Sequence, residues 1–485
     1  MNWQTAKSIE LDVRLFIDGA WRTGFDGRTR PIADPATGEP AGRVAMAGDM
    51  DLEDAVVAAA RGFARWRATP PFARAHILRE AAALLRQRAD VLAAQLTTEQ
   101  GKPLAQARAE ILGSADTFDW FAEEGKRCFG QVIPGRTSAF HTLTRLEPVG
   151  AVAAFSPWNF PVSQAAKKLA AALAAGCSVI LKAPEEAPAA CAGMVRALAD
   201  AGLPSGTLGL LYGEPARISE FLISHPTIRN VTFTGSVGVG KALAGFAGRH
   251  MKRVTMELGG HAPVIVCSDA DLALATEELN RMKFMNAGQV CLAPTRFLVA
   301  RPVYAEFLDR FSRKTQELRV DSGHAEQVDM GPLANPRRVQ AMDELVGDAL
   351  RAGARVACGA RRLDRPGNFY APTVLYDVPV DAKAMNEEPF GPLALFRPFD
   401  ELEEAIAEAN RLPYGLASYV YTRSLATEAA VTEQLEAGMV AVNRVFSSTI
   451  EAPFGGVKDS GFGTEGGSYA IRNFLNEKMI TRFVG

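Results

Sequence analysis

Short apolar runs alternate with amphipathic segments over most of the chain. Hydrophobic residues at three- and four-residue spacing predict helices over residues 52–66 and 71–99. From residue 150 the pattern changes, because apolar runs bounded by glycine or proline predict strands that are separated by helical segments. The predicted strands are 150–155, 179–182, 208–212, 230–234 and 253–256, and the helices between them are 162–175, 188–201, 216–224 and 239–246.

A second alternating half runs from residue 262 to about 445 and includes strands 296–300 and 418–421 and helix 303–318. Strands that alternate with helices predict parallel sheets covered on both faces. The 485 residues exceed the ~250–300 at which chains begin to divide into domains. We therefore expect an α/β fold with two doubly wound sheets, whose ligands bind beyond the carboxyl ends of the strands.

Composition and charge exclude several classes of function. The chain has 53 basic and 55 acidic side chains, and this balance supplies no electrostatic attraction to nucleic acid. No apolar run approaches the ~20 residues needed to span a membrane. The six cysteines are never two or three residues apart, so neither a metal site nor a Cys-x-x-Cys redox pair is expected. Without a signal-peptide pattern, the chain is predicted to be cytoplasmic.

Cys291 is the cysteine whose surroundings favour chemistry, since it lies in a glycine-containing turn between a helical stretch and a strand. The alternative is a buried small hydrophobic residue, which is the common state of a free cysteine. A thiolate nucleophile needs a base or a cation nearby, and none of the six histidines is close to Cys291 in sequence. A papain-like Cys–His pair is therefore not supported.

Two polar residues follow predicted strands at the expected ligand-binding edge. Glu257 comes directly after strand 253–256, where it is either a surface carboxylate or a general base tuned by partial burial. Asn159 lies between two prolines, where it either stabilises a turn or donates its amide to an oxyanion. The glycines at 235, 238 and 240 connect a strand to a helix, and they serve either phosphate binding or tight packing.

Six segments in unbroken order resemble the signatures of the aldehyde dehydrogenase superfamily. They are PWNFP at 157–161, FTGS at 233–236, MELGG at 256–260, GQVC at 288–291, EPFGP at 388–392 and PFGG at 453–456. The resemblance covers roughly residues 14–480. It implies an NAD-binding domain from 1–128 and 148–256, a catalytic domain from 257–460, and an oligomerisation arm from 129–147 and 461–485.

The resemblance also implies catalytic roles. Cys291 would attack the aldehyde carbon, Asn159 and the Cys291 backbone N–H would hold the oxyanion, and Glu257 would activate water to hydrolyse the thioester. Glu257 would also help to deprotonate Cys291. Lys168 and Glu465 would lie near the nucleophile or in a proton path, with salt-bridge partners as the alternative role.

For the cofactor, the resemblance places Lys182 and Glu185 at the adenosine ribose. A glutamate there repels a phosphate, so we expect NAD to be preferred over NADP, which stays possible. The other expected cofactor contacts are Trp158, Gly213, Phe233, Gly235, Ser236, Leu258, Gly259, Glu388 and Phe390.

For the substrate, the chain looks most like the branch that oxidises succinate, glutarate or 2-oxoglutarate semialdehyde. Relatives clamp the distal carboxylate with two arginines, but here Lys167 and Met285 stand at those positions. Either the clamp is weakened or relocated to Arg444, or the pocket favours neutral, more apolar aldehydes. The remaining expected substrate contacts are Phe160, Ser448 and Phe454.

The sequence also bears on two alternative functions and on the oligomeric state. A coenzyme A-acylating dehydrogenase would not need the water-activating carboxylate of Glu257, and a catalytically silent protein would not need Cys291, Glu257 and Asn159 together. Residues 129–147 and 478–483 have the pattern of edge strands that need covering, so we expect a homodimer or homotetramer.

Overall fold

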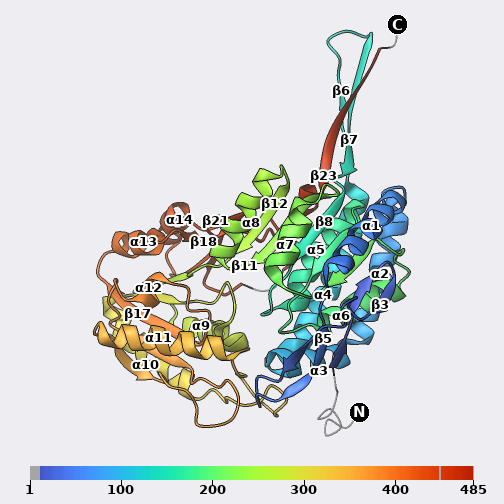
Figure 1. Cartoon of the computed structure of the whole chain (residues 1–485). Coiled ribbons are helices and arrows are strands. Elements are labelled where there is room, and N and C mark those ends of the chain that lie inside the picture. The colour runs from blue at the N-terminus through green and yellow to red at the C-terminus, as the bar shows by residue number, and fades with distance from the viewer. Residues whose placement is uncertain (1–10, 447–448, 484–485) are drawn as a thin grey trace.

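A computed structural model of the chain describes residues 11–446 and 449–483. Two large sheets form two bodies that lie side by side, as Figure 1 shows, and a slender arm projects from one of them. This is the predicted α/β architecture with two parallel, helix-covered sheets. Within the described residues, no helix is both long and apolar enough to cross a membrane.

The first sheet has the strand order β22-β12-β11-β8-β9-β10-β2-β3, and its five inner strands are parallel. These inner strands are β8 (Ala151–Phe155), β9 (Val179–Lys182), β10 (Leu208–Leu211), β11 (Ile228–Gly235) and β12 (Arg253–Leu258). Antiparallel strands close both edges: β2 (Leu15–Ile17) and β3 (Ala20–Arg22) on one side, and β22 (Gly461–Phe462) on the other.

Helices cover this sheet in layers. Two of them, α5 (Pro161–Ala175) and α6 (Ala189–Asp200), contact the inner strands, and the outer helices pack on them in turn. The outer helices are α2 (Pro71–Gln87), α3 (Ala89–Gln100) and α4 (Leu104–Glu124), and a further group against the sheet comprises α1 (Asp49–Trp66), α7 (Pro215–Ser224) and α8 (Val237–Arg249).

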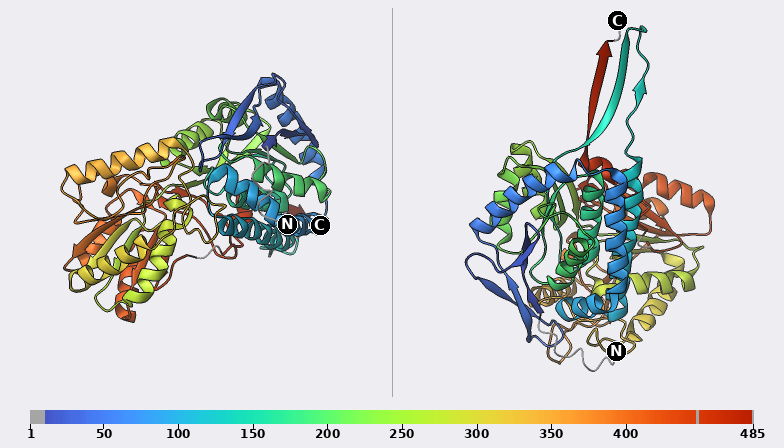
Figure 2. Two further views of the ribbon diagram at one scale, coloured as in Figure 1. Left: turned by 90° about the horizontal axis from the view of Figure 1, so that it is seen from below. Right: turned by 90° about the vertical axis from the view of Figure 1, so that its right-hand side faces the viewer.

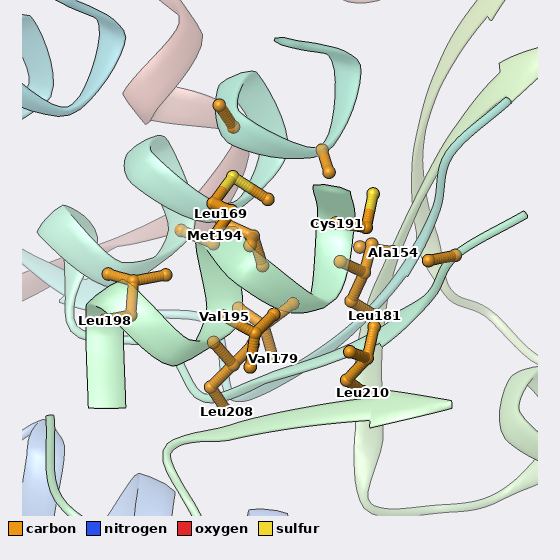
Figure 3. Packing of buried hydrophobic residues seen from close by; sticks show 14 of the residues in the cluster. Ala154, Leu169, Val179, Leu181, Cys191, Met194, Val195, Leu198, Leu208 and Leu210 are labelled. Carbon is orange, nitrogen blue, oxygen red and sulfur yellow. The ribbon is translucent and has the colours of Figure 1, made fainter. Parts of the chain in front are cut away.

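The core of this body lies between α5, α6 and strands β8 to β10. Figure 3 shows the helix side chains Leu169, Met194, Val195 and Leu198 gathered against strand side chains that include Val179, Leu181, Leu208 and Leu210. All of them are almost completely buried. Because both faces of a parallel sheet are covered, its strands are apolar without alternation, which is why the sequence pattern identified them.

The second sheet has the order β15-β16-β17-β14-β13-β19-β20 and is parallel except for the edge strand β15. Its strands are β13 (Pro263–Val266), β14 (Arg296–Ala300), β15 (Arg355–Cys358), β16 (Thr373–Tyr376), β17 (Leu393–Phe399), β19 (Ala417–Tyr421) and β20 (Met439–Val442). The accompanying helices are α9 (Leu272–Phe284), α10 (Arg301–Gln316), α11 (Pro336–Arg351), α12 (Lys383–Asn386), α13 (Leu402–Asn410) and α14 (Leu425–Gln434).

The arm is a three-stranded antiparallel sheet that extends away from the body, as the right-hand view of Figure 2 and the top of Figure 1 make visible. It consists of β6 (Val132–Ile133), β7 (Phe140–Pro148) and β23 (Leu475–Phe483), so it joins two segments far apart in the chain. Two smaller sheets complete the described strands. One contains β1 (Leu11–Val13), β4 (Thr29–Ala33) and β5 (Pro40–Ala45), and the other contains β18 (Tyr414–Gly415) and β21 (Val457–Lys458).

Two details of the predicted elements were wrong. The segment 71–99 is two helices, because the backbone of Arg88 leaves the helical conformation at φ −96° and ψ 5° while the hydrophobic spacing continues across the break. Strand β12 continues to Leu258, since it pairs with β11 as far as Gly235 and with β22 at Gly461. Glu257 therefore lies inside the strand rather than after it. The domain boundaries stay a prediction.

Candidate active site

A cavity of about 470 Å³ opens between the two bodies, at the carboxyl ends of β8, β11 and β12. Its walls come from both halves of the chain, and they include the three residues expected to carry the chemistry. The lining residues are Pro157, Trp158, Asn159, Gln164, Thr234, Gly235, Ser236, Glu257, Leu258, Gly259, Cys291, Asn335, Arg337, Arg338, Glu388, Phe390, Leu416 and Phe454.

Cys291 reaches the cavity from a tight turn after α9. The turn requires left-handed backbone at Asn286 (φ 50°), Ala287 (φ 54°) and Gly288 (φ 71°). A β-carbon at Gly288 would stand 2.1 Å from the Gly391 carbonyl oxygen, so this position accepts only glycine. The glycine of the GQVC segment thus serves the turn that presents the thiol.

Asn159 lies in the loop that connects β8 to α5, and it is 5% exposed. Its side-chain Nδ2 donates a hydrogen bond of 3.0 Å to the backbone oxygen of Gln289, two residues before Cys291. A side-chain amide has two N–H donors, so the second remains for another acceptor in the cavity. The bond joins the Asn159 loop to the Cys291 loop, although the chain separates them by 130 residues.

Glu257 is a buried carboxylic acid at 2% exposure, and neither side-chain oxygen has a hydrogen-bond partner among the described residues. Burial and the negative charge of Glu465 hold the pKa of Glu257 well above its ordinary value, while Lys168 and Lys167 oppose this shift. A carboxyl group with unused oxygens that face a cavity suits a general base or acid.

Lys168 and Glu465 form a buried ion pair that does not line the cavity. Lys168 Nζ also donates to Thr234 Oγ1 at 2.6 Å, and Thr234 does line the cavity. Glu465 is held by a backbone bridge to Phe454, another wall residue. One oxygen of Glu465 has no partner among the described residues. The structure thus places Lys168 and Glu465 close enough to Glu257 for their charges to act on its pKa.

The Cys291 thiol is neutral in this environment. Burial raises its pKa to about 12, Glu388 and Glu257 act in the same direction, and the positive charge of Lys167 acts against them. A thiol of this kind needs its proton removed as it reacts. Lys167, rather than a histidine, is therefore the cation that favours the thiolate.

Seven of the expected cofactor residues line the cavity: Trp158, Gly235, Ser236, Leu258, Gly259, Glu388 and Phe390. The Trp158 and Phe390 rings meet edge to face with centroids 5.5 Å apart. A β-carbon at Gly259 would lie 2.2 Å from Glu388 Oε2, so glycine is required for this carboxylate to approach the β12 end. Burial raises the pKa of Glu388 to about 7, and the Gly260 N–H and Arg338 lower it.

The other four expected cofactor residues do not line the cavity. Lys182 and Glu185 form a buried ion pair at 2.8 Å, and Glu185 Oε1 accepts the Gly213 N–H at 2.8 Å. These three residues are thus one unit at the carboxyl ends of β9 and β10. The ring of Phe233 packs on Gly235, where a β-carbon would stand 2.4 Å from the ring.

These residues fit a nicotinamide dinucleotide. Gly235 and Ser236 lie at the N-terminus of α8, where free backbone N–H groups and the helix dipole favour a pyrophosphate. The fixed Glu185 carboxylate can accept hydrogen bonds from the hydroxyl groups of a ribose. Glu388 and Phe390 line the same cavity as Cys291, with Glu388 accepting the Gly260 N–H and Phe390 meeting the Trp158 ring.

The expected substrate residues are placed unevenly. Phe454 lines the cavity, and the Lys167 ammonium lies 3.7 Å from the centre of its ring. Phe160 instead packs its ring against the Lys102 ammonium, and Met285 packs partly buried against the core of the second body. Arg444 is exposed, and Ser448 lies outside the described residues.

Seven cavity residues were not among the site residues expected from the sequence: Pro157, Gln164, Thr234, Asn335, Arg337, Arg338 and Leu416. Thr234 belongs to the FTGS segment and could have been included. Gln164 lies one turn from the start of α5, and the arginines lie at the start of α11, whose sequence carries no motif. Arg337 pairs with Glu186 across the two bodies at 2.9 Å.

Comparison with known proteins gives a consistent result over nearly the whole chain. The model of the "Aldehyde dehydrogenase family" matches residues 21–480. The chain is 49% identical to a 4-(hydroxymethyl)benzenesulfonate dehydrogenase of Comamonas testosteroni, over 96% of this chain and 97% of that protein. It is 40% identical to a 3-sulfolactaldehyde dehydrogenase of Pseudomonas putida, covering 97% of both, and 40% identical to the NADP(+) succinate-semialdehyde dehydrogenase of Escherichia coli, covering 96% and 97%.

A solved structure gives the same answer for the fold. An NAD+ complex of an aldehyde dehydrogenase from Bacillus cereus superposes with a TM-score of 0.97 at 32% identity, covering 100% of this chain and 99% of that one. The expected superfamily is thereby confirmed. The chain belongs to the aldehyde dehydrogenase family, and it is an oxidoreductase that acts on aldehydes with NAD or NADP.

Proposed function

We propose that this protein oxidises an aldehyde with a distal anionic group to the carboxylic acid, with NAD as the preferred cofactor. The observation that carries the proposal is the convergence of Cys291, Glu257 and Asn159 on one cavity. Aldehyde, water and oxidised cofactor are consumed, and acid, reduced cofactor and a proton are released.

The first step is addition of the Cys291 sulfur to the aldehyde carbon. Its proton leaves as the bond forms, and the ionised form of Glu257 is the nearby base that accepts it. The carbonyl oxygen becomes an oxyanion, which the Asn159 amide and the Cys291 backbone N–H stabilise. The Gln289 bond holds the Asn159 amide close to the nucleophile loop.

When bound, a nicotinamide dinucleotide would supply the acceptor for the hydride whose loss leaves a thioester on Cys291. Gly235 and Ser236 would bind its pyrophosphate, and Glu388 and Phe390 its nicotinamide riboside. After Glu257 has released the thiol proton to solvent, it takes a proton from water, which attacks the thioester and frees Cys291. This use of a buried carboxylate argues against transfer of the acyl group to coenzyme A.

Lys167 is the feature that favours an anionic substrate. Its ammonium stands over Phe454, a wall residue, and it forms no ion pair with any residue of the described ranges. A lysine pairs as a point charge and does not need the planar geometry of a carboxylate, so it accepts a sulfonate equally well. Three relatives are named for a benzenesulfonate, a sulfolactaldehyde and succinate semialdehyde, all of which carry an anion.

Glu185 supports the preference for NAD. Its carboxylate is buried and fixed by Lys182 and the Gly213 N–H, so it cannot turn away from a phosphate on the ribose. Like charges brought together in such a site cost several kcal/mol. One relative is named as NADP-dependent, and one related structure holds NAD+, so cofactor kinetics are the direct test.

The arm supports self-association as a homodimer or homotetramer. Val132, Met479 and Phe483 are 88%, 69% and 70% exposed on its strands, and exposed apolar edge strands are usually covered by a partner. Light scattering on the purified protein measures the assembly. The cytoplasmic location stays a prediction from the sequence.

Steady-state kinetics over a small panel test the function. We expect kcat/KM for succinate semialdehyde or 4-formylbenzenesulfonate to exceed that for hexanal and benzaldehyde at least about tenfold, which corresponds to ~1.4 kcal/mol. A smaller advantage contradicts the anionic substrate and leaves a neutral aldehyde. The C291A variant is the control and should have no turnover.

A further inference from the structure

A buried ion pair lies behind the Asn159 loop, outside the cavity. The Lys102 side chain is 0% exposed and that of Glu110 is 1% exposed, and their charged atoms are 2.5 Å apart. Burying two charges costs several kcal/mol per ion unless further hydrogen bonds compensate. The other contacts of this pair therefore indicate what it does.

The Lys102 ammonium also contacts the Asn159 loop at two points. Its Nζ donates to the Asn159 backbone oxygen at 2.7 Å and lies 3.9 Å from the centre of the Phe160 ring. The cation thus holds the peptide that follows Asn159 from the side away from the cavity.

Glu110 fixes the next residues of the same loop. Its Oε1 accepts the N–H groups of Val162 at 3.0 Å and Ser163 at 3.1 Å, at the start of α5. A carboxylate at a helix N-terminus is favoured by the free N–H groups and the helix dipole. The ion pair therefore immobilises residues 159–163 as one unit.

The nucleophile loop is tied to the same point. Asn286 Nδ2 also donates to the Asn159 backbone oxygen, at 3.0 Å. Asn286 adopts left-handed backbone at φ 50°, which is uncommon outside glycine and needs outside support. Gln100 Nε2 donates to its side-chain oxygen at 2.9 Å, and Gln106 accepts its N–H at 2.9 Å.

We infer that Lys102 is a positioning residue for aldehyde oxidation. It fixes the backbone carbonyl of Asn159, so that the side-chain amide of Asn159 faces the substrate carbonyl that reacts with Cys291. The inference rests on the proposed oxyanion role of Asn159. Without the ammonium, the Asn159 backbone oxygen keeps the Asn286 donor but loses its charged one, so the position of the Asn159 peptide is less tightly fixed. A misplacement of ~1 Å at a reacting group can cost ~10²-fold in rate.

The test is a cycle of substitutions. The variant K102M/E110Q removes both charges together, and the amide oxygen that it places at position 110 can still accept from the start of α5. It is combined with N159A, and all forms are assayed for kcat, KM and the rate at which iodoacetamide alkylates Cys291. Alkylation does not form an oxyanion, so it reports the state of the thiol alone. E99Q is the matched control, because Glu99 also acts electrostatically on Lys102 and Glu110 but accepts the Ala189 and Ala190 N–H groups at the start of α6 rather than donors of the Asn159 loop.

We expect K102M/E110Q to lower kcat by about 10- to 100-fold with alkylation within about twofold of wild type, and E99Q to keep wild-type kcat. In the N159A background the same substitutions should lower kcat by less than about threefold, because their target is gone. An equal loss in both backgrounds overturns the inference, as does a parallel loss of alkylation or no loss at all.

The outcome for N159A separates this inference from the proposed function. Wild-type activity in N159A refutes the oxyanion role itself, whereas a loss in N159A with an undiminished effect of K102M/E110Q refutes only the positioning role. If the double variant does not fold, K102Q replaces it, since Glu110 keeps two backbone donors there. The same comparison with N159A then decides the question.

Discussion

Replacing Glu257 by glutamine separates the two halves of the proposed reaction. Both carboxylate oxygens lack hydrogen-bond partners among the described residues, so the substitution breaks no bond and keeps the side-chain shape. The loss of activity then reports the loss of a base. A positioned base contributes ~10²–10⁴ in rate, or about 3–5 kcal/mol at 1.36 kcal/mol per factor of ten.

The effect should fall on hydrolysis of the thioester, which follows reduction of the cofactor. Rapid mixing of E257Q with saturating aldehyde and NAD should therefore give a burst of about one reduced cofactor per active site, followed by a steady rate ~10²–10⁴-fold below wild type. Glu465 should not substitute as a base, because its charge is engaged by Lys168.

Two controls define the interpretation. C291A should show neither burst nor steady turnover, and acid-quenched E257Q should carry the acyl group on Cys291. A steady rate equal to wild type would refute the assignment of Glu257 as the base for water. Because Glu257 is also proposed to accept the Cys291 proton, the burst should be slowed less than the steady rate. A burst whose rate falls as much as the steady rate would make deprotonation of Cys291 the larger part of its role.

Three further substitutions follow from the charges of the site and the core. In K167M, the activity profile for every aldehyde should move to higher pH because Lys167 lowers the Cys291 pKa. At the optimum pH of each form, kcat/KM for anionic aldehydes should fall ~10–100-fold with little change for benzaldehyde; equal losses on all aldehydes would contradict this. In E185Q, kcat/KM for NADP relative to NAD should rise at least about tenfold, since the side-chain shape and one of the two accepted hydrogen bonds are kept while the negative charge is lost; an unchanged ratio would exclude Glu185 as the discriminator. Burial raises the Glu99 pKa from 4.5 to about 8, so its stabilising contribution is complete below pH 4.5 and is lost as pH rises through 8. Thermal unfolding between about pH 5 and 8 should therefore depend less on pH in E99Q than in wild type, and identical profiles would refute the shift.

Local periodicity predicted the two parallel sheets well, because their strands are apolar on both faces and their helices have one apolar stripe. It missed the short strands β1 to β5, where runs of three to six residues carry little pattern. It also joined α2 and α3, since a break at one residue leaves the hydrophobic spacing almost unchanged.

The sequence by itself determined which residue types reach the cavity, because parallel strands end at one edge and the motifs follow those ends. Only the tertiary structure decided their relations: the Asn159 bond to Gln289 across 130 residues, the pairing of Lys168 with Glu465 across 297, and the Lys102 contact behind Asn159. Such contacts depend on how separate elements pack, and no periodic pattern encodes the distance between side chains from different elements. That packing also decides how deeply each ionisable group is buried and which charges surround it, and therefore its pKa.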